Sequence, residues 1–546
     1  MDQVEYTRVK EVKRGDKMEN SLIKPMSNEF IEYLRDESRT IGQAESISFP
    51  KNEEEVIAIL KDLYLKEVSI TIQGARTGLS AGAVPRGGHI MNLSRMDAIT
   101  AMRCDEKGTF FITLQPGVVL SQLRKQIENK KFDISQWSDE SKKALVKFSN
   151  APEQFFSPDP TESSATIGGM VSCNASGARS YLYGPTRNYI TALRVVLYNG
   201  QILTIRKGEV SAKGHTLDLT TEQGNFFTAQ LPTYQMPKTK NASGYYIEDN
   251  MDAIDLFIGS DGTLGVVTEI EVKLLPLPHI IWGVSCFFER EKDSIEFVIA
   301  IREQLKCIAS IEFFDGDALT ILRHQKEQKP AFSQLPAVEE RMNSAIYIEI
   351  HCKEEETAME TLIKIGQLMN ESGGSEKDTW VARNEADRNQ LMFFRHAIPE
   401  SVNMLIDQRK KKDPIITKLG TDMSVPDQHL RYTMEMYHSM IQEKGLQSAI
   451  WGHIGNNHLH VNILPRNKKD YKKGKELYVQ WASEVTRLGG AVSAEHGVGK
   501  MKANFLTVMY GQNHVDEMVA LKRTFDPKAL FGAGNMFDPR KEGACI

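Results

Sequence analysis

The chain has 546 residues, more than one hydrophobic core organises, so its length predicts two or three domains. Hydrophobic residues make up 41% and charged residues 25%, an ordinary globular balance, and the net charge of -5 gives no sign of a nucleic-acid-binding face. Six scattered cysteines without a C-x-x-C pair argue against an iron–sulfur cluster and a disulfide framework, and free thiols fit a reducing compartment.

The ends and the apolar runs of the chain bear on its location. The N-terminal residues carry charges without an apolar core, so they do not resemble a secretory signal. Because no run of about 18 apolar residues occurs, we expect no transmembrane segment. The sequence predicts a cytoplasmic protein and leaves peripheral contact with a membrane open.

The first half of the chain predicts an arm and then an α+β domain. Residues 1–45 are polar and are expected to form an arm or short helices. An apolar stripe over residues 53–64 predicts a helix. Polar stretches at about 138–153 and 207–240 are interpreted as mobile insertions. Strands are expected at residues 68–72, 110–114, 192–197 and 269–275.

Three glycine-rich segments accompany these strands: residues 73–85 (the first), 157–188 (the second) and 259–267 (the third). The first directly follows a strand, and successive backbone N–H groups in such a turn, with Arg76, suit an anion. It matches neither the dinucleotide fingerprint nor the Walker loop. One such segment is typical of a surface loop, whereas three indicate a ligand that the backbone approaches closely.

From residue 280 onwards, strand-like and helical patterns alternate. This alternation predicts a second domain with an antiparallel sheet covered by helices. A helix over residues 515–525 is expected to fold back at the end. Strands are expected at 281–288, 307–314, 345–352, 415–425, 448–454 and 458–464, and helices at 355–369 and 428–442.

Two histidine motifs lie in the second domain. In residues 452–462, GHIGNNHLHVN, strand alternation places His458, His460 and Asn462 on one face, and the central turn brings His453 back towards it. Residues 493–500, SAEHGVGK, add a carboxylate beside a further imidazole. A lone buried histidine is usually structural, but four in two spaced motifs favour a site for zinc, iron or manganese.

The glycine-rich segments resemble the flavin-binding domain of the vanillyl-alcohol oxidase / p-cresol methylhydroxylase (PCMH) superfamily. The histidine motifs resemble its D-lactate, glycolate and D-2-hydroxyglutarate dehydrogenase branch. The resemblance implies an α+β protein with a two-subdomain, PCMH-type FAD-binding domain. Its expected parts are an N-terminal arm (1–45), the FAD-binding domain (46–278), a substrate or cap domain with the metal site (279–510) and a C-terminal helical segment returning to the FAD domain (511–546).

On this resemblance FAD lies across the first domain, with its pyrophosphate on residues 74–80 and its isoalloxazine near residues 168–178. Attachment is expected to be non-covalent, since residues 74–85 contain no histidine. The residues expected to contact FAD are Gly74, Ala75, Arg76, Thr77, Gly78, Leu79, Ser80, Pro158, Thr166, Gly168, Gly169, Ser172, Asn174, Gly177, Ala178, Gly262, Gly265, Val266 and Val267.

The resemblance also implies roles in the second domain. The metal ligands are His453, His460 and Glu495, the catalytic base is His496, and the substrate contacts are Arg395, Lys418, Asn462 and His496. His458 stands where the family usually has Asn, so it is open whether it is an extra ligand or an outer group. A solvated surface charge is the alternative for Lys418. Pro399 replaces a family Thr, which weakens the case for a dicarboxylic substrate.

These parts together predict an FAD- and metal-dependent dehydrogenase that oxidises a D-2-hydroxy acid, D-lactate first, by hydride transfer to flavin N5. Glycolate and D-2-hydroxyglutarate are close alternatives. A flavin-dependent ether-lipid synthase and a non-catalytic FAD-binding subunit are less favoured. A separate electron acceptor is implied, a quinone, a cytochrome or an electron-transfer flavoprotein, and a homodimer is left open.

Overall fold

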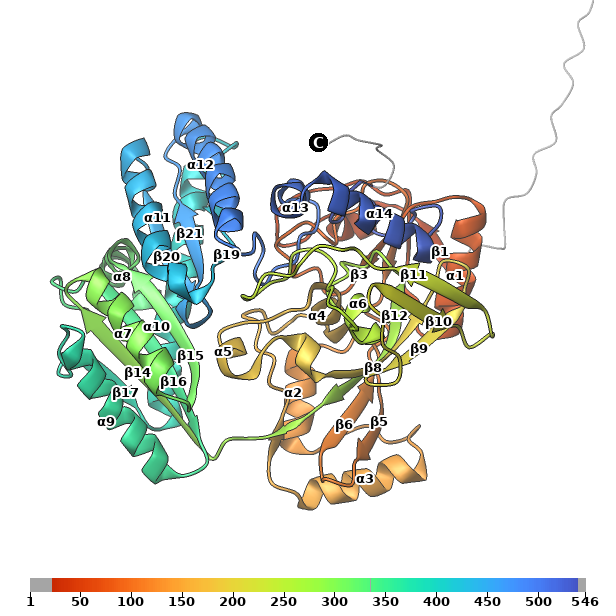
Figure 1. Cartoon of the computed structure of the whole chain (residues 1–546), viewed down its shortest axis with the longest axis horizontal. Helices are drawn as coiled ribbons and strands as arrows, with labels where there is room; N and C mark the ends of the chain where they lie inside the picture. Colours follow the sequence, from red (N-terminus) through yellow and green to blue (C-terminus); the bar gives the residue numbers. More distant parts are fainter. Residues whose placement is uncertain (1–21, 334, 539–546) are drawn as a thin grey trace, which may run out of the picture.

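A computed structural model describes residues 22–333 and 335–538 of the chain. It shows two bodies side by side, each built of sheets and helices (Figure 1). The chain builds most of the first body, crosses through β13 (Leu275–Pro276) into the second, and returns at its end to the first. The predicted α+β class, with a helix-covered antiparallel sheet in the second part, is confirmed.

Two main sheets organise the first body. One has four strands in the order β1-β2-β4-β3, and the other has five in the order β5-β6-β12-β8-β9. The strands are β1 (Ile23–Pro25), β2 (Ser46–Ser48), β3 (Ile70–Gln73), β4 (His89–Asn92), β5 (Ile99–Cys104), β6 (Phe110–Leu114), β7 (Gln154–Phe155), β8 (Ile190–Val196), β9 (Ile202–Arg206), β10 (Thr216–Thr220), β11 (Phe226–Gln230), β12 (Val266–Lys273) and β13. The helices are η1 (Asn28–Leu34), α1 (Glu53–Leu65), α2 (Leu120–Asn129), α3 (Asp139–Asn150), α4 (Ile167–Cys173), α5 (Ser180–Tyr183), η2 (Thr186–Tyr189), α6 (Ala253–Phe257), α13 (Ala503–Tyr510) and α14 (Gln512–Phe525).

Helix α1 confirms the apolar stripe expected at residues 53–64. Asn52 caps it by accepting a hydrogen bond from the backbone N–H of Glu55, and Val56, Leu60 and Leu63 are buried beneath it. Glu53, in its first turn, accepts hydrogen bonds from Arg194 of β8 and Thr268 of β12, so the start of the helix is also tied to the sheet that it covers.

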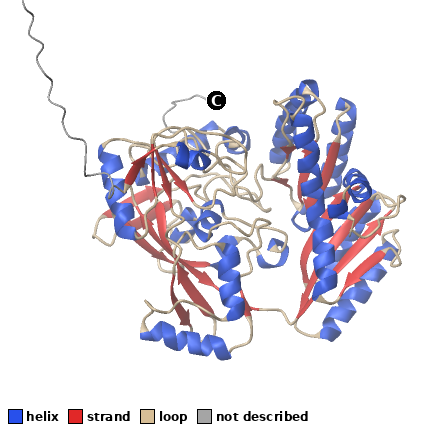
Figure 2. Cartoon of the chain, turned by 180° about the vertical axis from the view of Figure 1, so that it is seen from behind, coloured by secondary structure: helices blue, strands red, loops and turns tan. Residues whose placement is uncertain are grey.

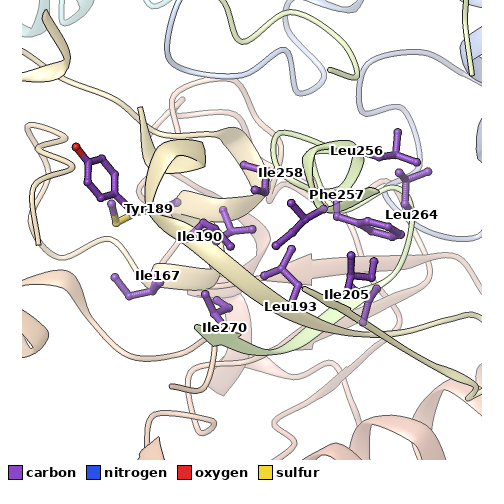
Figure 3. Close-up of a cluster of buried hydrophobic side chains, with 14 of the residues drawn as sticks. Ile167, Tyr189, Ile190, Leu193, Ile205, Leu256, Phe257, Ile258, Leu264 and Ile270 are labelled. Carbon is purple, nitrogen blue, oxygen red and sulfur yellow. The ribbon is translucent and has the colours of Figure 1, made fainter. Parts of the chain in front are cut away.

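The larger core of the first body packs helices against the five-stranded sheet (Figure 3). Leu193 of β8, Ile270 of β12 and Phe257 of α6 all belong to this cluster, and Leu193 lies between the other two. Burying side chains of this size contributes roughly 1.5–3 kcal/mol each relative to leaving them exposed. Ile167, within the second glycine-rich segment, and Ile258, directly before the third, belong to the same cluster, so both segments are anchored in a packed core.

The interpretation of two stretches as mobile insertions is wrong for the first stretch and for most of the second, which form regular, packed structure, whereas residues 231–240 form neither helix nor strand. Helix α3 occupies the first stretch: Ser138 accepts a hydrogen bond from Ser141 N at its start, and Phe148 packs edge-on against Phe110 at 5.2 Å. In the second stretch, β10 and β11 form a hairpin that buries Leu217 and Ala229. Polar sequence in both places reflects one solvated face, not irregular backbone.

The second body contains one eight-stranded sheet in the order β17-β14-β16-β15-β20-β21-β18, with β19 also paired to β21, and every pairing is antiparallel. Its strands are β14 (Ile280–Phe288), β15 (Ile308–Asp315), β16 (Ser344–Cys352), β17 (Thr379–Ala382), β18 (Leu419–Gly420), β19 (Met423–Ser424), β20 (Ser448–His453) and β21 (His458–Ile463). Its helices are α7 (Glu291–Gln304), α8 (Gly316–Gln328), η3 (Pro330–Phe332), α9 (Glu355–Glu371), α10 (Glu385–Lys410), η4 (Asp427–His429), α11 (Leu430–Lys444), η5 (Ile454–Asn456) and α12 (Lys468–Arg487).

Helices cover this sheet on both faces (Figure 2). Helices α7, α9, α11 and α12 bury one face, whereas α8 and α10 bury part of the other. The remainder of that second face carries the polar residues Glu312, His453, His460 and Asn462, and it borders the cavity described below. The expected continuous strand at 415–425 is wrong: the chain there makes only the two-residue strands β18 and β19.

The end of the chain returns to the first body as expected. Phe525 of α14 packs edge-on against Phe257 at 5.5 Å, and the ammonium of Lys522 donates to a carboxylate oxygen of Asp526 at 2.9 Å. Across residues 22–333 and 335–538, no helix combines the length and apolar character needed to cross a bilayer. The five cysteines in the same ranges are all unpaired, and Cys545 lies outside them.

Candidate active site

The three glycine-rich segments, far apart in sequence, line one groove of the first body. Fourteen of the residues expected to contact FAD line it, namely Gly74, Ala75, Arg76, Thr77, Gly78, Leu79, Ser80, Thr166, Gly168, Gly169, Ser172, Gly262, Gly265 and Val267. The other five lie outside the lining, namely Pro158, Asn174, Gly177, Ala178 and Val266. Asn174 instead ends α4 in a left-handed conformation and accepts a hydrogen bond from Arg187 N.

Close approach of two chain segments explains a glycine in this groove. A Cβ on Gly74 would lie 2.2 Å from the hydroxyl of Thr166, so the first segment crosses the start of α4 only because that position lacks a side chain. Gly78, by contrast, would have nothing within 4 Å of a Cβ, which leaves its backbone open to the groove.

The loop carrying the Glu-His pair closes one end of the groove. Asp261, in the third segment, accepts hydrogen bonds from the backbone N–H groups of Val498 (3.2 Å) and Gly499 (2.8 Å). The hydroxyl of Ser80, in the first segment, donates to the carbonyl of His496 at 3.0 Å. Burial raises the pKa of Asp261 to about 6. These bonds hold the histidine loop against the glycine-rich segments.

Three histidines and a glutamate gather where this loop meets the sheet of the second body. One nitrogen each of His453, His458 and His460 and one oxygen of Glu495 lie within 4.8 Å of one another. Glu495 Oε1 is 3.3 Å from His453 Nε2 and 3.6 Å from His460 Nε2. The turn at η5 places His453 directly opposite His458 in the pairing of β20 with β21, as expected for this motif.

Hydrogen-bond acceptors behind the rings orient His453 and His460, the two histidines that we expected to bind metal. His453 Nδ1 lies 2.7 Å from Glu312 Oε1, and His460 Nδ1 lies 3.0 Å from the carbonyl of Thr421. Both contacts leave Nε2 directed towards Glu495. A carboxylate or carbonyl behind the ring is the usual support of a metal-ligating histidine. Burial alone would raise the pKa of Glu312, but Arg395 and His453 outweigh it and lower that pKa to about 2.

His458 supports the same interpretation. Its ring is fully buried, and neither ring nitrogen has a hydrogen-bond partner. Although Nε2 lies 2.9 Å from Asp422 Oδ1, the two atoms are not aligned for a hydrogen bond. Burial lowers the pKa of His458 to about 3, which keeps the imidazole neutral and able to donate a lone pair. Three imidazoles and a carboxylate are a donor set that zinc, iron or manganese would fit.

His496 stands apart from this group, between two carboxylates. Its Nδ1 is 3.3 Å from Asp422 Oδ2, and its Nε2 is 3.3 Å from Glu495 Oε1. The ring is 28% exposed and stacks on His460 with centroids 5.5 Å apart. A partly exposed imidazole backed by a buried carboxylate can accept a proton from a bound molecule.

A second cavity, of about 1050 Å³, begins beside this histidine cluster and extends along the second body. The cavity is lined by the three expected substrate contacts besides His496, which are Arg395 of α10, Lys418, and Asn462 of β21. Arg395 Nε donates to Glu312 Oε2 at 3.1 Å. The ammonium of Lys418 lies 5.8 Å from the ring centroid of Trp451, and burial lowers its pKa to about 8.

Three residues of this region were missed from the sequence: Glu312, Lys240 and Asp422. Glu312 interrupts an otherwise apolar strand, and this charged residue in an apolar run could have marked it as functional from the sequence alone. Lys240 donates to Glu495 Oε2 at 2.6 Å, and it comes from an irregular loop with no recognisable pattern. Asp422 accepts from Ser493 Oγ at 2.7 Å and pairs with Lys502. Burial would raise the pKa of Asp422, but His496 and Lys502 lower it well below the usual range.

Comparison with known families matches both bodies. Residues 44–137 and 140–206 match the model of an FAD binding domain, and residues 281–536 match the C-terminal domain of FAD linked oxidases. The first match contains the whole of the first and second glycine-rich segments, and the third lies outside both matches. The second match contains both histidine motifs and α10.

Relatives of similar length were also found. The chain is 26% identical over 504 residues to the glycolate oxidase subunit GlcD of Bacillus subtilis (strain 168), covering 91% of this chain and 90% of that protein. It is 25% identical over 514 residues to a D-lactate dehydrogenase of Anaerostipes hadrus, covering 92% of each. A D-2-hydroxyglutarate dehydrogenase of Stutzerimonas stutzeri (strain A1501) is 26% identical, covering 92% of this chain and 94% of that protein.

Solved structures share the fold. A substrate-bound p-cresol methylhydroxylase superposes with a TM-score of 0.64 at 14% identity, covering 95% of both chains. An alkyldihydroxyacetonephosphate synthase superposes with a TM-score of 0.61 at 15% identity, covering 95% of this chain and 82% of that one. At this identity the likeness concerns the fold alone.

The two-body fold and the glycine-rich groove thus define an FAD-binding oxidoreductase of the PCMH type. The chain contains an FAD binding domain in its first half and the C-terminal domain of FAD linked oxidases in its second.

FAD is expected to be bound without a covalent link. Among the described residues, the groove lining contains a single histidine, His496, whose ring nitrogens both lie 3.3 Å from carboxylates. Acid precipitation should therefore release yellow FAD into the supernatant, and mass analysis of the polypeptide should give the mass of the unmodified chain. Colour that stays in the pellet, with a matching gain in mass, would contradict this expectation.

Proposed function

We propose that the protein is an FAD- and metal-dependent dehydrogenase that oxidises a D-2-hydroxy acid to the 2-oxo acid. D-lactate is the first candidate substrate, with glycolate and D-2-hydroxyglutarate as alternatives. Relatives named for each of these three substrates support the reaction class. The likeness to alkyldihydroxyacetonephosphate synthase concerns the fold alone and adds no support for a transferase reaction.

One observation carries the proposal: the flavin groove and the second cavity meet at Glu495 and His496. These two residues line both spaces. A substrate in the second cavity would therefore reach the groove beside a candidate base and a candidate metal ligand. A substrate carbon can react with a flavin only where the two spaces join, because hydride transfer needs the two reacting atoms about 3–3.5 Å apart.

Arg395 and the histidine cluster would divide the binding of a 2-hydroxy acid between them. Arg395 uses Nε for Glu312, so its two Nη groups remain for a carboxylate. Metal on His453, His460 and Glu495, with His458 as a further neutral donor, would act as a Lewis acid on the substrate hydroxyl. Glu312 contacts both Arg395 and His453, so it holds the carboxylate clamp and the ligand cluster at a fixed separation.

His496 would accept the hydroxyl proton while the hydrogen on C2 leaves with its electron pair. FAD, when bound, supplies the acceptor for that hydride. Asp422, which faces Nδ1 of His496, would stabilise the protonated imidazole. Electrons then pass to a separate acceptor, a quinone, a cytochrome or an electron-transfer flavoprotein, since the cysteine pattern supplies no iron–sulfur centre.

Anaerobic mixing with substrates tests the proposal directly. D-lactate, glycolate and D-2-hydroxyglutarate are each added to the FAD-loaded protein, with L-lactate as the matched control. Loss of the oxidised flavin absorbance is expected with at least one of the first three and not with L-lactate. Unchanged absorbance with all 2-hydroxy acids, in protein shown to contain FAD and metal, would refute it.

A further inference from the structure

The second cavity is larger than a small 2-hydroxy acid requires. Its volume of about 1050 Å³ is at the upper end of the range, roughly 300–1000 Å³, that holds a drug-sized ligand. Arg395 and His496, which would bind the head of the substrate, occupy only one end of it. Most of the cavity is therefore free to contact the rest of a larger molecule.

Helix α10 shows the direction in which the cavity extends. Arg395, Pro399, Asn403, Ile406 and Lys410 all line it, one residue for each turn of the helix. The fifteen steps from Arg395 to Lys410 correspond to roughly 22 Å at 1.5 Å per residue. The cavity thus follows the helix from the carboxylate clamp to the helix C-terminus.

The middle of the cavity is apolar and aromatic. Phe314 and Trp451 come from the sheet, and the rings of Tyr478 and Phe505 stack with centroids 5.2 Å apart on the facing helices α12 and α13. Met501 adds an apolar side chain that is 57% exposed at the margin of the same cavity. Exposed apolar side chains beside a cavity are typical of a surface that contacts an apolar ligand.

The far end of the cavity is cationic. Lys410, Lys475 and Arg39 line it, and Lys418 lies between them and the middle, with its ammonium 5.8 Å from the ring centroid of Trp451. Arg39 pairs with Asp407, one turn before the end of α10, and its charge contributes to the lowered pKa of Lys418. Lys475 lies one turn from Tyr471, whose hydroxyl accepts a hydrogen bond from Thr417. These contacts place Arg39, Lys410 and Lys475 around the same end. Glu37, two positions from Arg39, is the acidic residue of the lining nearest to them in sequence. Glu312, Asp422 and Glu495 lie instead at the head end, where each is already paired.

We propose that the preferred substrate is a 2-hydroxy acid with an extended tail, apolar along its length and anionic at its end. The tail would follow α10 between the aromatic walls, and its terminal carboxylate or phosphate would lie among the lysines. The proposal rests on the proposed 2-hydroxy-acid chemistry at His496. D-lactate has the same reacting head, and it would fill only the end of the cavity next to Arg395.

The test compares D-lactate with two long acids of equal carbon number, D-2-hydroxydodecanoate and D-2-hydroxydodecanedioate, and with an ω-phosphorylated analogue. Flavin reduction gives kcat/KM for each, and perturbation of the flavin spectrum by the matching 2-oxo acids gives equilibrium binding. We expect kcat/KM about tenfold or more above that of D-lactate for the acids with an anionic tail. The carboxylate and phosphate arms then identify which terminal anion is preferred.

Two changes in the cavity extend the test. Lys410→Glu combined with Lys475→Glu should lower kcat/KM and weaken binding about tenfold for the anionic-tail acids, without affecting D-lactate. Asn403→Trp, in mid-cavity, should impair all long acids and spare D-lactate. Gln408→Trp, an exposed position on the same helix outside the cavity lining, is the matched control.

The outcomes separate the two proposals. If D-lactate reduces the flavin as efficiently as the long acids, and Asn403→Trp changes nothing, the extended-tail proposal is overturned while the proposed function stands. If D-2-hydroxydodecanoate, whose tail is uncharged, is preferred and the lysine changes have no effect, the proposal that the tail ends in an anion is wrong. If no 2-hydroxy acid of any length reduces the flavin, the proposed function itself fails.

Discussion

His496→Ala protein is expected to keep its FAD and its metal yet reduce the flavin about a hundredfold or more slowly, the usual contribution of a general base. His496 lines both the flavin groove and the substrate cavity, and its nitrogens face Asp422 and Glu495. Removing the imidazole leaves no group at that position to take the hydroxyl proton. Stopped-flow flavin reduction with D-lactate, beside metal and FAD content, measures the effect.

His458 is the alternative base, and the structure argues against it. Its ring is fully buried and does not line the substrate cavity, whereas His496 is 28% exposed and does. His458→Ala is therefore expected to affect metal content more than the proton-transfer step. Reduction of the flavin by His496→Ala protein at the unchanged rate would assign the base elsewhere, and His458 would then be tested first.

His460→Ala protein is expected to lose metal and turnover together. His460 Nδ1 is held by the carbonyl of Thr421, so Nε2 is directed to the cluster around Glu495. Removing a side chain that would bind the metal directly should weaken the metal site by more than the roughly 10–100-fold that loss of a hydrogen-bond partner behind such a ligand costs. FAD should remain, because the glycine-rich groove lies in the first body.

Metal analysis, FAD absorbance and thermal unfolding of the purified variant measure this result. His438→Ala, whose imidazole contacts Glu291 away from the cluster, is the matched control and should keep metal and activity. The ligand assignment is wrong if His460→Ala retains its metal. It is equally wrong if fully active unaltered protein contains metal far below one equivalent per chain.

Local sequence patterns determined most of the strands and the two histidine motifs. The expected strand at 110–114 matches β6, and the strand at 345–352 corresponds to β16. These predictions succeed because alternation and continuous apolar runs depend on neighbouring residues only. The same alternation correctly grouped His458 and His460 on one face of β21, and the turn before it brought His453 alongside.

Helix α10 shows where local patterns were insufficient. Proline in a helix interior removes a backbone donor and usually ends the helix, so Pro399 obscured a 26-residue helix. The buried side chains Phe394, Ile398 and Val402 stabilise this helix by packing on the sheet. Tertiary packing therefore decided that Arg395 and Lys410 would line the same cavity.

The sequence by itself determined that this chain carries flavin-binding loops and a histidine–glutamate motif, because each is encoded within a short segment. Only the tertiary structure decided which distant groups complete the site. Glu312 meets His453 across 141 positions, and Lys240 meets Glu495 across 255. Buried charges such as these need partners to offset the loss of water, and partners so distant in sequence are chosen by the fold.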